Sequence, residues 1–352
     1  MTSPSAAAMP ALSVLDLIPV RSGQTTGEAL RASTALVKTA DELGYRRFWV
    51  AEHHNTTSVA STNPPVLIAM LASATERISV GSGGVMLPNH APLVVAEQFA
   101  LLEAAFPGRI DLGIGRAPGT DPLTRYVLRG QSAESADEAV ARFAEYVDDI
   151  GMLMRPEGVE MSYGPRVQPL RATPHATSVA RMWLLGSSDY SARLAAQKGL
   201  PYVFAHHFFG QGTAEAIKLY RDTYQPSEAH PEPRTFLTVN ASVAETKEQA
   251  YRLAIPHMQA MIALRVGGAL EAQRSVEEAE EIGFPEGQDR MADAMASRWI
   301  VDEPESARRR IAEFAAEHGV DEVMVQPIGG ALAAHPVDRY PSRERTLRLL
   351  AG

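Results

Sequence analysis

The sequence contains no cysteine among its 352 residues. This absence excludes disulfides, thiolate metal sites and a cysteine nucleophile, and it is typical of a protein of the reducing cytoplasm. The chain also lacks any run of eighteen apolar residues, so we expect no membrane-spanning helix. Residues 1–10 lack the basic start and apolar stretch of a secretory signal, and we expect them to form a loose N-terminal tail.

Positively charged residues are fewer than negatively charged ones: 33 Lys and Arg stand against 42 Asp and Glu, which gives a net charge of −9. An acidic chain repels phosphate polymers and anionic membrane surfaces, so neither nucleic acid nor a membrane is an expected partner. Hydrophobic residues make up 45% of the chain and charged residues 21%, which is the composition of a globular protein with a large core.

Short apolar runs rich in Val, Ile and aromatic residues alternate with longer stretches of helical periodicity, the pattern of parallel βαβ units. The expected strands are Leu12–Pro19, Arg47–Ala51, Ile78–Gly83, Ile110–Ile114, Met182–Leu185, Tyr202–Ala205, Phe236–Val243 and Glu322–Gln326. The expected helices are Glu28–Leu43, Pro64–Thr75, Pro92–Phe106, Ala136–Met154, Ser191–Lys198, Thr213–Tyr224, Thr246–Leu264 and Glu305–His318, with a last helix at Ser342–Leu350. Eight such pairs predict an α/β protein with a (β/α)8 TIM barrel, in one domain over residues 1–352.

The alternative architecture is an open doubly wound sheet, which is marked by a Gly-x-Gly-x-x-Gly turn after its first strand. Only Gly23 and Gly27 follow the first strand here, so the barrel is favoured. Two stretches, residues 116–135 and 267–291, interrupt the regular repeat. We expect both to be loop insertions at the C-terminal face of the barrel, where the active site of this fold lies, and we expect 267–291 to form a lid.

The second strand leads directly into Glu52, His53 and His54, at the end of a barrel strand where catalytic groups are found. Strand alternation predicts that Glu52 and His53 face opposite sides, with only one of them toward the barrel mouth. Hydrogen-bonded loop histidines without chemistry are an alternative interpretation that stays open. A metal hydrolase is another, but no acidic residue except Glu52 directly follows a strand, so no metal site is predicted.

The fifth strand ends in a serine-rich turn with Ser187, Ser188 and Ser191, where the next helix begins. Free N–H groups, hydroxyls and the helix dipole together favour a phosphate at such a turn, although serine is also a common helix cap. Arg116 follows the neighbouring fourth strand and offers a positive charge to the same phosphate.

Two other groups of residues near strand ends have simpler interpretations. Gly83 and Gly84 end the third strand, where residues without side chains let the backbone lie flat against a ligand, or form a plain turn. Asn63 before Pro64, and Asn89 with His90 before Pro92, are typical of helix N-caps followed by proline.

Taken in order, several short motifs resemble those of the bacterial-luciferase-like monooxygenase family, over about residues 12–326. They are Glu52-His53-His54, the stretch from Val80-Gly81 to Leu87-Pro88, Pro107-Gly108-Arg109 leading into Gly113-Ile114-Gly115-Arg116, and Leu185-Gly186-Ser187-Ser188. The resemblance implies a TIM barrel that binds FMN without a covalent bond.

In residue terms, the resemblance implies that Arg116 holds the FMN phosphate together with the three serines Ser187, Ser188 and Ser191. It implies that His53 is the catalytic histidine and that the Gly83–Gly84 peptide beneath the flavin is cis. Ser187 departs from bacterial luciferase, which has an acidic residue there.

The activity that the resemblance implies is oxygenation of a small organic substrate by reduced FMN and dioxygen through a flavin hydroperoxide, with a separate reductase supplying the reduced flavin. His53 would stabilise or move a proton, and the site would exclude water. The alternatives are hydride transfer with the deazaflavin F420 on the same barrel, or flavin binding without catalysis. The family also implies a homodimer, in which we expect the helices Pro64–Thr75 and Pro92–Phe106 to take part, because both are apolar over more than one face.

Overall fold

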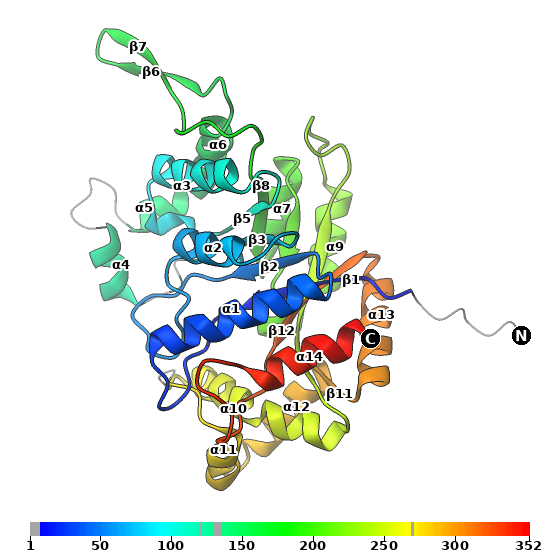
Figure 1. The fold of residues 1–352 in the computed structure, drawn as a ribbon. Coiled ribbons are helices and arrows are strands. Elements are labelled where there is room, and N and C mark those ends of the chain that lie inside the picture. Colours follow the sequence, from blue (N-terminus) through cyan, green and yellow to red (C-terminus); the bar gives the residue numbers. More distant parts are fainter. Residues whose placement is uncertain (1–7, 118, 120, 130–135, 269–270) are drawn as a thin grey trace, which may run out of the picture.

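The structure, a computed structural model, describes residues 8–117, 119, 121–129, 136–268 and 271–352 (Figure 1). Eight of its strands are β1 (Ala11–Asp16), β2 (Arg47–Val50), β3 (Ser79–Ser82), β5 (Ile110–Gly115), β8 (Arg181–Gly186), β9 (Tyr202–Phe204), β10 (Thr235–Val243) and β12 (Glu322–Pro327). They pair in parallel in this order, and β12 returns to pair with β1. The sheet therefore closes into a barrel, which confirms the predicted (β/α)8 fold over the open sheet.

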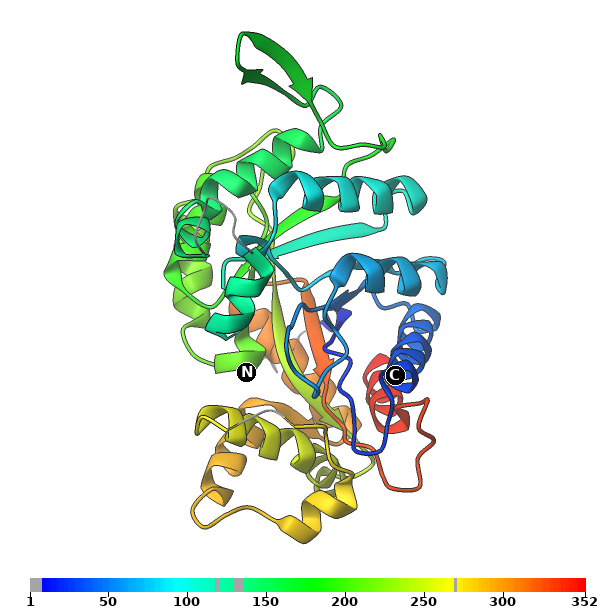
Figure 2. The same cartoon turned by 90° about the vertical axis from the view of Figure 1, so that its left-hand side faces the viewer.

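Helices surround this barrel on its outside (Figures 1 and 2). Those of the first half are α1 (Thr26–Glu42), α2 (Pro64–Ser73), the 3₁₀ helix η1 (Leu87–Asn89), α3 (Pro92–Ala105), α4 (Pro122–Arg129), α5 (Ala136–Ala141) and α6 (Phe143–Leu153). Those of the second half are α7 (Asp189–Gln197), α8 (His206–Phe209), α9 (Thr213–Asp222), α10 (Lys247–Arg265), α11 (Val276–Ile282), α12 (Asp289–Arg298), α13 (Pro304–His318) and α14 (Pro341–Ala351). Asn63 caps α2 as predicted, because its side chain accepts a hydrogen bond from the N–H of Val66.

Aromatic side chains fill the inside of the barrel. Trp49, Trp183 and Phe236 meet edge to face, with ring centroids 5.1–5.8 Å apart. Each such pair contributes about 0.5–1.5 kcal/mol beyond its buried area. They pack with Leu15, Val203 and Met324 from three other strands, so the barrel interior is a solid core and not a channel.

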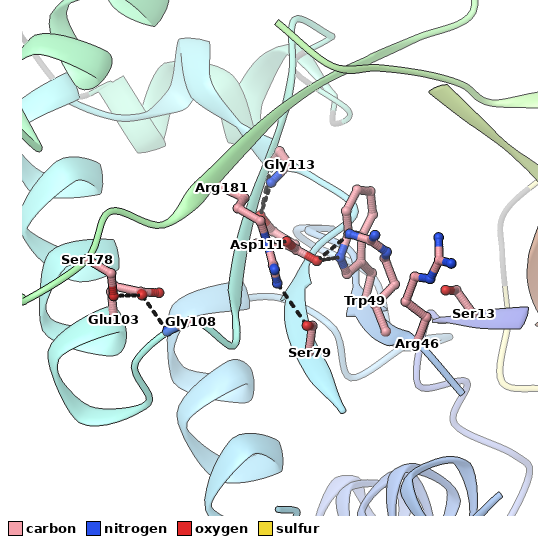
Figure 3. Close-up of polar contacts among 12 residues, drawn as sticks. Ser13, Arg46, Trp49, Ser79, Glu103, Gly108, Asp111, Gly113, Ser178 and Arg181 are labelled. Carbon is pink, nitrogen blue, oxygen red and sulfur yellow. Dashed lines mark hydrogen bonds and ion pairs between the residues drawn. The ribbon is translucent and has the colours of Figure 1, made fainter. Parts of the chain in front are cut away.

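Charged side chains close the N-terminal end of the barrel. Arg47 donates to Glu322 at 2.6 Å and to Asp111 at 2.9 Å, and its guanidinium lies 4.8 Å from the ring centre of Trp183. Asp111 also accepts from Trp49 Nε1 at 3.0 Å and from Arg181 Nε at 2.8 Å, as Figure 3 shows. These partners compensate each other's charge within the core, which leaves the C-terminal end of the barrel for the site.

The expected loop insertions contain helices, so they are not plain loops. The stretch 116–135 includes α4, and 267–291 includes α11 and the start of α12. Residues 271–275 lie beside the loop after β1, since Gln273 N donates to Val20 O at 2.8 Å. Residues 118, 120, 130–135 and 269–270, together with residues 1–7 of the expected tail, are outside the described part of the chain.

Four further strands lie outside the barrel circuit. β4 (Val85–Met86) pairs with β5, and β11 (Ile300–Asp302) pairs with β10. The hairpin β6–β7 (Val159–Tyr163 and Arg166–Leu170) is antiparallel and projects from the body of the molecule (Figure 1). The sequence analysis did not predict this hairpin, and the expected helix Ala136–Met154 is interrupted between α5 and α6.

Candidate active site

A pocket of about 670 Å³ opens at the C-terminal ends of the barrel strands. This volume lies within the range of about 300–1,000 Å³ that cofactor and substrate sites have. Every residue predicted for the site contributes to its lining: His53, Gly83, Gly84, Arg116, Ser187, Ser188 and Ser191. The barrel thus brings together residues that are up to 138 positions apart in the chain.

One side of the pocket combines a cation with a helix N-terminus. Arg116 follows β5 directly, and its guanidinium lies 4.1 Å from the ring centre of Tyr190 in the first turn of α7. Ser188 is the N-cap of α7, but its side chain makes no capping hydrogen bond. The first N–H groups of a helix have no partner within the helix, so this turn offers donors beside a positive charge. Asp189, in the same turn, is acidic, which makes the charge of Arg116 more important for any anion here.

Two glycines that line the pocket, Gly84 and Gly186, allow the backbone there to lie close to neighbouring segments of the chain. The peptide bond between Gly83 and Gly84 is cis, as the family resemblance implied. A Cβ on Gly84 would lie 2.8 Å from the carbonyl oxygen of Gly113, and one on Gly186 would lie 2.2 Å from Ser191 Oγ. Any side chain at these two glycines would therefore push apart β5 or the serine turn.

Glu52 is a buried carboxylate at the edge of the pocket, with 1% of its surface exposed. It accepts hydrogen bonds from His54 Nε2 at 2.7 Å, from His90 Nε2 at 2.8 Å and from the N–H of Met86 at 2.9 Å. Burial alone would raise the pKa of Glu52, but these hydrogen bonds lower it to about 2. The ionised carboxylate only accepts, so both rings present a protonated Nε2 to it. Glu52 thereby fixes the backbone that follows the Gly83–Gly84 bond.

His53 has a different environment from its two neighbours. Its Nδ1 is buried and has no hydrogen-bond partner within the described part of the chain. Burial lowers the pKa of His53 below its usual value, and the negative charge of Glu52 only partly opposes this. His53 is therefore a neutral imidazole near pH 7, able to accept or donate a proton inside the pocket.

Comparison with known proteins agrees with this geometry. The family model described as luciferase-like monooxygenase matches residues 11–322. The chain belongs to this family. It is 38% identical to the luciferase-like monooxygenase of Escherichia coli (strain K12), covering 90% of each chain. It is 36% identical to the N-acetyl-S-alkylcysteine monooxygenase of Bacillus subtilis (strain 168), covering 73% of this chain and 74% of the other.

Solved structures show the same barrel. The crystal structure of apo-MsnO8 matches with a TM-score of 0.84 and 33% identity over 97% of each chain. More distant folds include the oxygenating constituent of 3,6-diketocamphane monooxygenase from the CAM plasmid of Pseudomonas putida in complex with FMN (TM-score 0.68, 16% identity, 98% and 97% covered). An F420-dependent secondary alcohol dehydrogenase in complex with an F420-acetone adduct matches with a TM-score of 0.65 at 13% identity, covering 97% and 99%.

Two expectations about this luciferase-like site are wrong. Glu52 and His53 were expected to face opposite sides, yet both line the pocket, because β2 ends at Val50 and strand alternation stops there. Asn89 and His90 were expected to cap a helix, but the N-cap of α3 is Ala91, and His90 instead binds Glu52. No spacing in the sequence relates His90 to Glu52, since the fold alone brings them together.

The sequence analysis did not predict the residues that line the side of the pocket opposite His53. This side consists of His207 after β9, Asn240 on β10, Gln326 on β12 and His257 in the middle of α10. The pair His206 and His207 directly follows the predicted strand Tyr202–Ala205, but no motif there indicates a role for it, and nothing in the sequence indicates which face of α10 meets the pocket. Among the described residues, no group of three or more His, Asp or Glu side chains is arranged so that it could hold a metal ion. No helix in this part of the chain is long and apolar enough to cross a membrane.

Proposed function

We propose that this protein is an FMN-dependent monooxygenase, which uses reduced FMN and dioxygen to oxygenate a small organic molecule. The observation that carries the proposal is the position of Arg116 beside the uncapped first turn of α7, at the edge of a pocket that His53 and Gly83–Gly84 also line. A phosphate in that place would meet a guanidinium, helix N–H groups and the hydroxyls of Ser187, Ser188 and Ser191.

The pocket suits the remainder of a flavin as well. Gly83 and Gly84 offer a surface without side chains, and most of the lining away from the serine turn is apolar, including Leu15, Trp49 and Met324. Bound reduced FMN would supply the electrons and the reaction with dioxygen. The chain itself carries no Gly-x-Gly-x-x-Gly turn after its first strand, so we infer that a separate reductase delivers the reduced flavin.

The residues of the chain would act on this chemistry in three ways. Arg116 and the first turn of α7 bind and orient the phosphate. The buried surroundings of His53 exclude water from the reacting atoms, and its neutral ring holds or moves one proton there. Glu52 keeps the Gly83–Met86 backbone in position through its bond to the N–H of Met86.

Hydride transfer with F420 is the second candidate, because an F420-dependent enzyme shares the fold. That likeness is at 13% identity and concerns the fold alone, whereas relatives at 36–38% identity are named monooxygenases. We therefore favour FMN.

The test is to titrate the protein with FMN, riboflavin and F420, and to follow oxygen uptake with each reduced form. FMN should bind more tightly than riboflavin, which lacks the phosphate. Arg116→Ala should weaken FMN binding roughly 10- to 150-fold, the equivalent of a charge-assisted bond of about 1.5–3 kcal/mol, and leave riboflavin binding unchanged. Binding of F420 in preference to FMN, without oxygen uptake, would replace the proposal with the second candidate.

A further inference from the structure

The wall of the pocket opposite His53 carries buried polar side chains that the cofactor proposal does not use. In the closed strand order, β9 lies across the barrel from β2, β10 from β3 and β12 from β5. His207, Asn240 and Gln326 therefore lie across from His53, Gly83–Gly84 and Arg116 respectively. We call His207, Asn240, Gln326 and His257 the polar wall.

The hydrogen bonds of His207 determine which of its ring nitrogens carries the proton. Thr238 Oγ1 has a single proton, which we assign to its hydrogen bond with the carbonyl oxygen of Phe204 at 3.1 Å. Toward His207 Nδ1, 2.7 Å away, the same hydroxyl must accept, so Nδ1 is protonated. Burial lowers the pKa of His207 to about 4, and the ring is therefore neutral near pH 7 with Nε2 as a bare acceptor.

Asn240 presents a second acceptor. Its Nδ2 donates to the carbonyl oxygen of His207 at 2.8 Å, and this partner fixes the amide orientation because a carbonyl oxygen only accepts. The Oδ1 that remains is buried, in a residue that is 1% exposed, and has no hydrogen-bond partner within the described chain. A buried acceptor without a partner is rare in folded proteins, and in a ligand pocket it indicates a group that a ligand completes.

The other two residues extend the same surface. Gln326 is the direct strand partner of Asn240 in the β10–β12 ladder, so their side chains lie next to each other. The ring of His257 lies 5.4 Å from that of Trp299, and burial together with the charge of Arg343 lowers the pKa of His257 to about 3. The polar wall thus contains only uncharged side chains, and its bare acceptors are Asn240 Oδ1 and His207 Nε2.

We propose that the polar wall recognises the hydrogen-bond donor of the substrate, which we assign to the class of uncharged organic molecules bearing a hydroxyl or N–H group. The inference rests on the proposed function, since it takes the side with Arg116 and α7 to be filled by FMN. A carboxylate substrate would find no cation at this wall and would face the lone pairs of Asn240 Oδ1 and His207 Nε2, whereas a phenol, alcohol or amide N–H would donate to these two atoms.

The experiment compares three probe pairs in which one member has a hydrogen-bond donor and the other has none: 1-octanol with its isomer methyl heptyl ether, 4-propylphenol with 4-propylanisole, and N-methylhexanamide with N,N-dimethylhexanamide. In the last two pairs a methyl group replaces the donor hydrogen. Each probe is titrated by calorimetry into the FMN-loaded and the flavin-free protein. We expect the donor member to bind at least about 10-fold more tightly in one or more pairs, which is the scale of one hydrogen bond. Equal binding within every pair, or no binding of any probe, overturns the proposal.

Variants test whether the preference for donor-bearing probes depends on the polar wall. Asn240→Leu and His207→Phe should abolish the donor preference and keep FMN affinity within a few-fold, while Met261→Leu, a change on the same pocket without polar atoms, should keep both. If FMN affinity falls together with the preference, the wall belongs to the flavin site and the proposal is wrong. Failure of the parent to bind FMN would instead contradict the proposed function, and the flavin-free titrations would still report the donor preference.

Nitrogen-15 spectra of the histidines should show His207 as the Nδ1–H form at pH 7.

Discussion

His53 differs from His54 and His90 in what its ring contacts. The other two rings are bound to Glu52, whereas Nδ1 of His53 is buried without a described partner and its side chain lines the pocket. Three histidines near one carboxylate therefore have two separate tasks. Two of them stabilise the ionised Glu52 and the backbone it holds, and the third remains available for chemistry.

We predict that His53→Ala separates chemistry from binding. The variant should bind reduced FMN within a few-fold of the parent, because His53 lies away from the serine turn and Arg116. It should release hydrogen peroxide and oxidised FMN roughly 10²-fold faster after mixing with oxygen, the usual scale for a lost proton-transfer group. Stopped-flow absorbance and a peroxide assay measure both quantities.

The matched control is His54→Ala, whose ring lies against Glu52 and not in the pocket lining. It should change the rate of flavin reoxidation only a few-fold. A His53→Ala protein that reoxidises at the parent's rate would show that this histidine has a structural role alone.

At the scale of elements, the sequence predicts the eight strands of the barrel, but it misses the short strand β11, although that strand is buried as well. The strands β2, β9 and β12 are buried along their whole length, and their apolar runs locate them to within a few residues. The hairpin β6–β7 was missed because the described side chains of β7 are nearly all exposed, so no burial pattern marks it. In the site, the residues directly after the second to fifth predicted strands were found, but His207 after the sixth was not. His90 and His257 could not be predicted, because they depend on contacts between distant elements.

The turn from β8 into α7 gives a prediction at this scale. A Cβ on residue 186 would lie 2.2 Å from Ser191 Oγ and 2.5 Å from Ser191 Cβ, so Gly186→Ala must displace the first turn of α7. We expect FMN affinity to fall about 10-fold and stability to fall by about 1–3 kcal/mol, as overpacking does. FMN and riboflavin titrations with urea unfolding measure these effects.

Gly27→Ala is the control, since its Cβ would make only an ordinary contact, 3.7 Å from the Arg31 side chain. It lies at the start of α1 and does not line the pocket, so it should leave FMN binding unchanged. An undiminished FMN affinity in Gly186→Ala would mean that the serine turn does not hold the phosphate.

At the scale of the whole molecule, four exposed apolar residues lie on the two neighbouring helices α2 and α3. Val66 and Met70 on α2 are 57% and 44% exposed, and Val94 and Leu101 on α3 are 47% and 56% exposed. The two helices pack against each other on the outside of the barrel (Figure 1). Apolar residues grouped in this way are typical of a protein interface, and a barrel that functions alone does not require them. We therefore propose that α2 and α3 form the contact of a homodimer.

This last prediction is tested by placing charge on that surface. In a two-fold symmetric dimer each residue of the patch occurs on both subunits, so Met70→Glu with Leu101→Glu introduces four like charges into the interface. The parent should sediment as a dimer at micromolar concentration and the double variant as a monomer, because desolvating these carboxylates beside one another costs more than such a contact contributes. The control is Val266→Glu, which changes an apolar residue that is 61% exposed at the end of α10, and this variant should remain dimeric. A monomeric parent, or a double variant that stays dimeric with native secondary structure, would remove α2 and α3 from the interface.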